Sequence, residues 1–140
     1  MLFRSTESIA DSQKALTLRP EYAAVYTNLG LCYEALGDLG KAEANYRRAI
    51  ELTRKQGLKD EWPFLNYAAM LAKRETPEAY LPLLKEALEL NPNSAKAHYY
   101  LGRALQRLGR MEEAKAALQR SCAIDPNDPE IGRASCRERV

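Results

Sequence analysis

The chain has 140 residues, 46% of them hydrophobic, which is enough to build one domain with a continuous core. Its 21 basic and 19 acidic residues give a net charge of only +2, which argues against nucleic acid or an anionic membrane as the main partner. No apolar run approaches the ~20 residues of a membrane-spanning helix, and no signal-like stretch opens the chain. We therefore expect a soluble and, by default, cytoplasmic protein.

Helical periodicity extends along almost the whole chain, and glycine or proline interrupts it at intervals. A first helix is expected to end at Pro20, and Gly37 suits the C-cap of the next. Thr76 and Ser94 suit N-caps. No segment alternates with period two, so we predict an all-α fold without strands. Helices are expected at 6–20, 23–36, 41–52 and 61–73, from 77 onward, and at 94–108 and 111–124.

The predicted helices repeat on a 34-residue period, which indicates a solenoid whose function lies on a surface shared by several units. Because glycine in mid-helix costs ~1 kcal/mol relative to alanine, we expect Gly30 and Gly102 where two helices approach closely. The first copy has Tyr26, Leu29, Gly30, Tyr33, Gly37, Ala42, Tyr46 and Ala49. The last copy, 72 residues on, has His98, Leu101, Gly102, Leu105, Gly109, Ala114, Leu118 and Ser121. The middle copy has Phe64, Tyr67, Ala68, Leu71, Glu75, Tyr80, Leu84 and Ala87.

This pattern resembles the tetratricopeptide repeat (TPR) family, in a bacterial-type protein, over about residues 5–128. The closing proline of a repeat is present as Pro20, Pro92 and Pro126, whereas Arg54 stands at that position of the first full repeat. Tyr80 also departs from the family, which usually has a small residue there. The resemblance implies a right-handed α-solenoid of stacked helix-turn-helix units that binds peptides on its concave side.

The repeat register also predicts the domain organisation. It indicates that the chain begins inside a repeat whose first helix is absent, so we expect a fragment. The expected divisions are the second helix of a truncated repeat at 1–22, a TPR unit at 23–56, an inserted loop at 57–60, TPR units at 61–94 and 95–128, and a non-repeat tail at 129–140.

Residues 131–140 lose all periodicity and can be encoded by a common sequencing adapter read in frame. A natural basic tail is the alternative interpretation. We expect the segment to be unpacked and dispensable, and we exclude it from the fold argument. Setting aside Arg133, Arg137, Glu138 and Arg139 leaves a chain with no net charge.

Few residues suggest chemistry. The single histidine, His98, opens a repeat and is expected to pack at a helix start. Cys32 and Cys122 have no CxxC partner and are interpreted as small core residues. No metalloprotease, nucleophile-elbow or phosphate-loop motif is present. We expect no enzyme activity, no cofactor and no metal.

The face of each first helix opposite its packing face is the candidate binding surface, because 100° per residue fixes which residues share that face. In the TPR family these faces line the concave side. The residues expected to line this groove are Thr27, Leu31, Glu34, Trp62, Leu65, Asn66, Ala69, Lys73, Lys96, Tyr99, Arg103, Gln106 and Arg107.

The chemistry of that surface predicts its ligand. Trp62 with its apolar neighbours forms a patch of the kind that marks interaction sites. Lys96, Arg103 and Arg107 would favour acidic side chains or a C-terminal carboxylate. Two plainer interpretations stay open: Trp62 packing locally beside Pro63, and the basic residues forming an ordinary solvated helix face.

One TPR subclass can be tested directly on these positions. Repeats that grip the C-terminal carboxylate of heat-shock chaperones use Lys and Asn, then Asn, then Lys and Arg. Only Asn66 and Lys96 agree with that set, so this clamp is not expected here. The corresponding positions hold Thr27, Leu31, Asn66, Lys96 and Tyr100.

The expected function is therefore a non-enzymatic protein–protein interaction module that binds a peptide or a partner domain. The alternative is a regulatory or substrate-recruiting arm of a larger enzyme or cell-envelope or secretion assembly. RNA binding, as in pentatricopeptide repeats, is disfavoured by the neutral charge. Self-association is also expected if no capping helix covers Ala97, Tyr100, Ala104 and Leu108.

Overall fold

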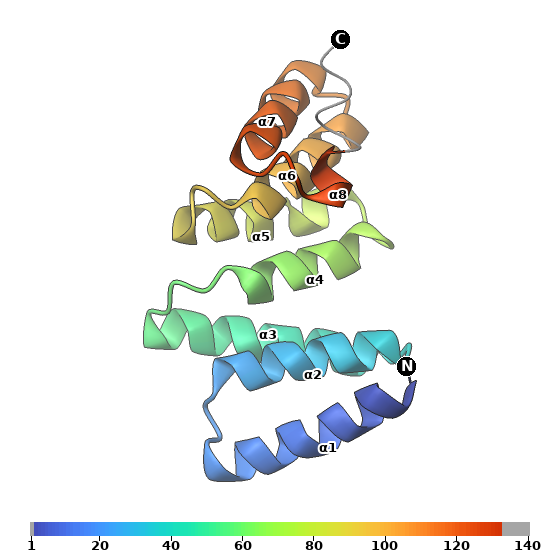
Figure 1. Ribbon diagram of the computed structural model, residues 1–140, viewed down its shortest axis with the longest axis vertical. Helices are drawn as coiled ribbons and strands as arrows, with labels where there is room; N and C mark the ends of the chain where they lie inside the picture. Colours follow the sequence, from blue (N-terminus) through green and yellow to red (C-terminus); the bar gives the residue numbers. More distant parts are fainter. Residues whose placement is uncertain (1, 133–140) are drawn as a thin grey trace. The chain divides into compact units, whose positions relative to one another are not determined.

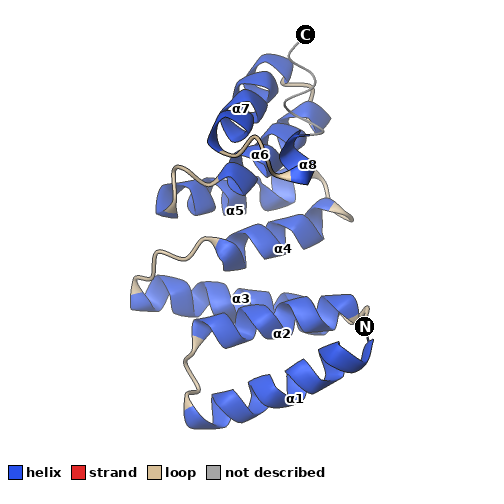
Figure 2. Ribbon diagram, viewed as in Figure 1, coloured by secondary structure: helices blue, strands red, loops and turns tan. Residues whose placement is uncertain are grey.

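A computed structural model describes residues 2–132 of the chain. Within these residues every regular element is a helix and no strand occurs (Figures 1 and 2), so the all-α prediction is confirmed. The helices are α1 (Leu2–Leu18), α2 (Ala23–Ala35), α3 (Leu39–Gln56), α4 (Trp62–Ala72), α5 (Pro77–Leu90), α6 (Ala95–Arg107), α7 (Met111–Ile124) and α8 (Pro129–Ile131).

The chain divides into two compact halves, Met1–Met70 and Leu71–Val140, and the division falls within α4. In the N-terminal half, α2 packs against both α1 and α3 (Figure 1). In the C-terminal half, α6 packs against α5, α7 and α8. The pairs α2/α3 and α6/α7 are the helix-turn-helix pairs that the repeat register predicts.

Glycine ends the first helix of both pairs. Gly37 and Gly109 adopt φ of 82° and 76°, a left-handed conformation in which a side chain would be strained. Each glycine N–H donates back into the last helical turn, from Gly37 to the carbonyl of Glu34 and from Gly109 to that of Gln106, at 3.0 Å in both cases. A third glycine, Gly57, ends α3 at φ 63°, so that helix continues four residues past its expected end.

The second helix of each pair places a large side chain against the mid-helix glycine of the first. A Cβ on Gly30 would lie within 2.9 Å of Cζ of Tyr46 and closer still to two other ring carbons. A Cβ on Gly102 would lie 2.6 Å from Cγ and Cδ2 of Leu118. The structure thus confirms that these glycines mark close helix contacts.

A second repeated contact joins each first helix to the turn before it. The hydroxyl of Tyr26 donates to the carbonyl of Pro20 at 2.9 Å. Exactly one repeat-pair later, Nε2 of His98 lies 2.9 Å from the carbonyl of Pro92. The histidine therefore has the helix-start role that the sequence predicts, through a hydrogen bond as well as packing.

The end of the described chain differs from the sequence expectation. Residues 129–132 are not an unpacked tail, because they include α8 and because Ile131 is fully buried in a cluster with Tyr99 and Leu118. Asp128 begins α8 as its N-cap, accepting hydrogen bonds from the N–H groups of Glu130 and Ile131. Residues 133–140, the rest of the suspected adapter segment, lie outside the described residues.

The flank expected to be bare is also covered. Ala97 and Ala104 are fully buried, and Tyr100 and Leu108 are partly buried. Tyr100 packs against the cluster that contains Ile131. The sequence-based reason for self-association, an uncovered flank on α6, is therefore wrong.

We expect Gly30→Ala to destabilise the N-terminal half by about 1–3 kcal/mol, because Tyr46 is fully buried and its ring has no room to move. The matched control is Gly40→Ala, also within a helix but with nothing closer to a new Cβ than 3.9 Å. It should be neutral or stabilising by up to about 1 kcal/mol. Urea denaturation followed by the emission of Trp62 measures both, and equal effects would contradict the close-contact argument.

We expect Ile131→Ala to destabilise the C-terminal half by about 2 kcal/mol, because it empties a fully buried position. Met111→Ala removes a side chain that is 58% exposed and should change stability by less than about 0.5 kcal/mol. Thermal unfolding followed by circular dichroism compares them. A silent Ile131→Ala would restore the view that this segment is dispensable.

Candidate functional site

Two adjoining hollows lie on the exposed face of α2, both within the N-terminal half. They share Asn28 and Leu31, so we treat them as one site and call it the α2 groove. The hollow on the α4 side has a volume of about 400 Å³ and is lined by Ala24, Thr27, Asn28, Leu31, Asp60, Trp62 and Asn66. The hollow on the α1 side has a volume of about 340 Å³ and is lined by Ser8, Asp11, Ser12, Asn28, Leu31 and Cys32.

Helical spacing explains why these residues share one face. Ala24, Asn28 and Leu31 are four and three residues apart on α2, which places them in a row. Trp62 and Asn66 are one turn apart on α4. The groove is thus formed by side chains on regular helices, which hold them more precisely than a loop would.

Asp60 is the loop residue of the groove, and it comes from the inserted segment before α4. Its Oδ1 accepts a hydrogen bond from the backbone N–H of Trp62 at 3.1 Å. That bond satisfies one of the N–H groups left without a partner at the helix start. It also holds a carboxylate next to the tryptophan.

Trp62 is the most prominent apolar group of the site. Its side chain is 50% exposed, although the two residues that follow it, Pro63 and Phe64, are buried. Leu31 on the facing side of the hollow is 44% exposed. Large apolar side chains that stay exposed around a cleft are typical of binding surfaces. Local packing beside Pro63 therefore does not cover Trp62.

Three residues predicted for the groove serve the interior of the protein instead. Leu65 is 1% exposed, so its expected outward position is wrong. Thr27 is 6% exposed, and its hydroxyl donates to the carbonyl of Ala23 at 3.4 Å. Glu34 accepts a hydrogen bond from the hydroxyl of Tyr46 at 2.8 Å. Burial, and then this bond to Glu34, raises the pKa of Tyr46.

Lys96 is held by ion pairs within the C-terminal half. Its Nζ lies 2.7 Å from Oε2 of Glu130 and 3.2 Å from Oδ2 of Asp128. Burial works against the charged lysine, but the two carboxylates outweigh it and raise the pKa of Lys96. The backbone N–H of Ile131, followed by Lys96, lowers the pKa of Asp128. This charge is therefore already compensated by α8.

Arg107 is occupied as well, and its partners explain a gap in the repeat pattern. The middle repeat has Glu75 where the other two have a C-cap glycine. The guanidinium of Arg107 donates to the carbonyls of Ala72 at 3.1 Å and Glu75 at 3.2 Å, and to the hydroxyl of Tyr80 at 3.0 Å. It thereby satisfies carbonyls beyond the last turn of α4 that no glycine cap serves.

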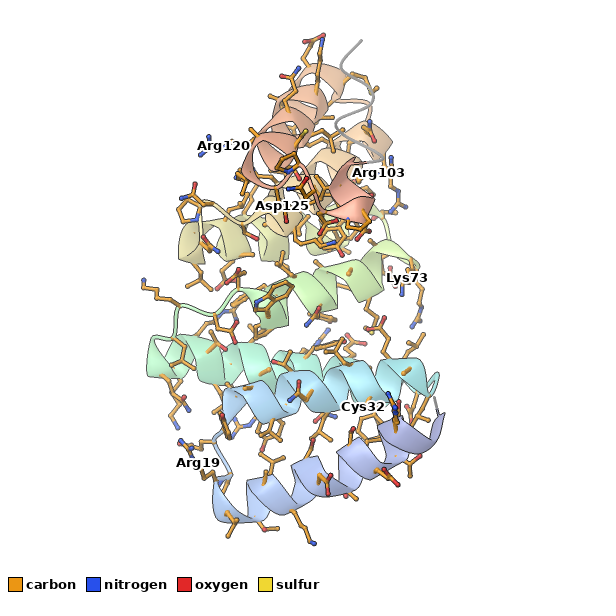
Figure 3. The ribbon with its side chains drawn as sticks, in the orientation of Figure 1. Arg19, Cys32, Lys73, Arg103, Arg120 and Asp125 are labelled. Atoms are coloured by element: carbon orange, nitrogen blue, oxygen red, sulfur yellow. The ribbon has the colours of Figure 1, made fainter. Side chains whose placement is uncertain are left out.

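The remaining predicted residues have mixed exposure. Arg103 and Lys73, both labelled in Figure 3, are exposed, and Arg103 donates to Oε1 of Gln106 at 3.2 Å. Tyr99 is 8% exposed and belongs to the Ile131 cluster, so its expected outward position is wrong. The other members are partly exposed, namely Asn66, Ala69 and Gln106.

Sequence reasoning missed several groove residues for identifiable reasons. Asn28 lies 40° from Ala24 on the helical wheel, so a slightly wider arc on α2 would have included it. Asp60 lies in an insertion, where helical periodicity says nothing. Asp11 and Cys32 face the α1 side, which was interpreted only as the remnant of an earlier repeat.

The described residues offer no metal site, since no three His, Cys, Asp or Glu side chains among them are grouped to hold an ion. None of the helices within residues 2–132 combines the length and apolar character needed to cross a bilayer.

Comparison with known proteins identifies the family. Tetratricopeptide repeat profiles match residues 23–55 and 70–135. The chain belongs to the tetratricopeptide repeat family. The first matched segment covers α2 and nearly all of α3, and the second covers α5 to α8. The family identified from residue spacing is confirmed.

Two curated relatives and one solved structure illustrate the similarity. Heat shock protein STI1 of Saccharomyces cerevisiae is 27% identical over 101 residues, covering 68% of this chain and 17% of that protein. The Hsp70-Hsp90 organizing protein of Triticum aestivum is 31% identical over 77 residues, covering 54% of this chain and 13% of that protein. The chain thus spans less than a fifth of the length of either relative.

The solved structure is that of YrrB, a TPR protein with an unusual peptide-binding site. It aligns with a TM-score of 0.70 at 26% identity, covering 91% of this chain and 64% of that one. The prediction of an all-α fold built from stacked TPR helix pairs is confirmed by this likeness together with the helices described above.

We expect Arg107→Lys to destabilise the C-terminal half by about 1 kcal/mol, because lysine cannot reproduce the fork that serves two carbonyls and a hydroxyl. Arg103→Lys, on the same helix, should have no measurable effect, because its hydrogen bond to Gln106 is exposed. Paired guanidinium denaturation curves distinguish the two. A larger loss for Arg103 would mean that Arg107 has no structural role.

Proposed function

We propose that this chain is a non-catalytic protein-interaction module that binds an extended peptide segment in the α2 groove. The observation that carries the proposal is the half-exposed Trp62 at the edge of a cleft of about 400 Å³ that Leu31 also lines. The family supports it, since relatives include an organizer of Hsp70 and Hsp90 and a protein with a peptide-binding site. Aromatic residues in such positions dominate the binding energy of many interfaces.

The groove offers a peptide two kinds of contact. An apolar side chain can lie between Trp62 and Leu31, removing exposed apolar area from water at about 25 cal/mol per Å². The amides of Asn28 and Asn66 can donate to and accept from the peptide backbone, which is independent of peptide sequence. Apolar contact would then supply specificity, and the amides would supply orientation.

The ligand need not be the carboxylate-ended peptide of the chaperone clamp. Of the five clamp positions, only Asn66 and Lys96 carry the required residue type. Lys96 is engaged by Glu130 and Asp128. Recognition of a terminal carboxylate would have to break these ion pairs, so we assign the binding energy to the Trp62 region.

A second candidate is favoured by the lengths of the relatives. Because the chain corresponds to less than a fifth of either one, the module can be an arm that recruits a partner to other domains. We also propose the repeat divisions predicted from the register: a partial repeat, then units at 23–56, 61–94 and 95–128 around the inserted loop. Both proposals leave the α2 groove as the recognition surface.

We expect Trp62→Ala to weaken peptide binding by more than about 1 kcal/mol, roughly fivefold or more, as truncation of an interface aromatic does. The matched control is Tyr22→Ala, an aromatic in the same half that is 43% exposed and lies outside the groove. It should leave affinity unchanged. Fluorescence anisotropy of labelled peptides, selected from a random library on the wild-type chain, measures both.

Because Trp62 is the sole tryptophan of the chain, its own emission provides a second readout. Peptide binding should shift this emission to shorter wavelength and protect it from acrylamide. Binding that leaves the emission unchanged, or that Tyr22→Ala weakens as much as Trp62→Ala, would place the ligand elsewhere and refute the proposal.

A further inference from the structure

Building on the proposed function, we propose that the α2 groove selects a peptide segment in which lysine or arginine flanks an apolar residue. The sequence pattern alone favours the opposite ligand, an acidic one, because three basic residues were assigned to the groove. The positions of the charges in the structure reverse that expectation.

Both charged side chains that line the α2 groove are carboxylates. Asp60 lines the hollow on the α4 side, and Asp11 lines the hollow on the α1 side. Because the two hollows meet at Asn28 and Leu31, the carboxylates lie on either side of the apolar centre. A bound segment with its apolar residue at Leu31 would have one carboxylate near each flank.

Each carboxylate keeps acceptor capacity for a ligand. Asp60 uses Oδ1 to cap α4, which leaves Oδ2 without a partner among the described residues. Asp11 is exposed and makes no hydrogen bond or ion pair with any residue that the structure describes. A carboxylate accepts hydrogen bonds from ammonium or guanidinium groups, and such charge-assisted bonds are stronger than neutral ones.

Nearby basic residues of the N-terminal half are engaged away from the groove. On α3, Arg47 lies 2.7 Å from Glu43, and Arg48 lies 3.0 Å from Glu51. At the end of the same helix, Lys55 lies 2.8 Å from Glu21. None of these residues lines the α2 groove. The groove carboxylates are therefore not compensated by them.

The basic residues of the C-terminal half offer little to an acidic ligand. Lys96 already faces two carboxylates, and Arg107 donates to two carbonyls and a hydroxyl. Of the three basic residues on which the acidic preference rested, Arg103 alone has no partner beyond a neighbouring side chain.

Trp62 strengthens the preference for a cation. A lysine or arginine side chain can lay its methylene groups along the indole while its charge reaches Asp60. A cation over the face of tryptophan is also attracted to the ring itself. An acidic side chain at the same position would meet a carboxylate and gain neither contact.

The test uses the complete chain and three synthetic peptides with blocked ends, free of tryptophan and tyrosine. Each carries one central leucine in a serine-alanine background, flanked on both sides by lysine, by glutamine or by glutamate. Titration of Trp62 emission gives the affinities. We expect the order lysine, glutamine, glutamate, with about a tenfold difference between the extremes at low salt that shrinks as salt is added.

Variants assign the selectivity to the carboxylates. Asp11→Asn combined with Asp60→Asn should bring the lysine and glutamate peptides to within about twofold of each other, because asparagine removes the charge yet can still cap α4. Glu89→Gln removes an exposed carboxylate on α5 and should leave the tenfold preference intact. Circular dichroism verifies that the double variant is folded.

The outcomes separate this inference from the proposed function. If the peptides bind and Trp62→Ala weakens them, but the glutamate peptide binds as well as the lysine peptide, the basic preference is wrong and the groove stands. A preference that survives in the double variant overturns the inference too. If none of the three changes the emission up to millimolar concentration, the proposed function itself fails.

Discussion

The contact between a glycine in the first helix and a large side chain in the second sets the geometry of both helix pairs. At Gly30 and Gly102 there is no room for even a methyl group, so each pair has one closest approach. Tyr46 and Leu118 fill that point completely or nearly so. Since one face of α2 is committed to this contact, its other face remains available to form a groove with α1 and α4.

Much of this architecture follows from short-range signals in the sequence. Gly37 and Gly109 end helices because of their own backbone freedom, and the hydrogen bonds to Pro20 and Pro92 come from residues only six positions later. Such features repeat with the chain and are visible in one copy. The helix α8 was not predictable in this way, because its stability depends on the burial of Ile131 against distant residues.

The binding surface was less predictable than the fold. A helical wheel gives the direction of a side chain, but it does not say whether another element covers it, which is why Leu65 and Tyr99 were misplaced. It also cannot reveal that Lys96 meets carboxylates more than 30 residues away in sequence. Trp62 was identified correctly as exposed because a large apolar residue on a polar face is informative by itself.

The role of Arg107 has a consequence for how such a chain can evolve. A repeat that has lost its glycine normally loses the means to end its first helix, yet here the next repeat supplies the missing donors. The middle and last repeats are thus no longer interchangeable copies. Duplicating or transplanting residues 61–94 without the arginine that follows would carry the defect and leave its compensation behind, so the two units are inherited as one.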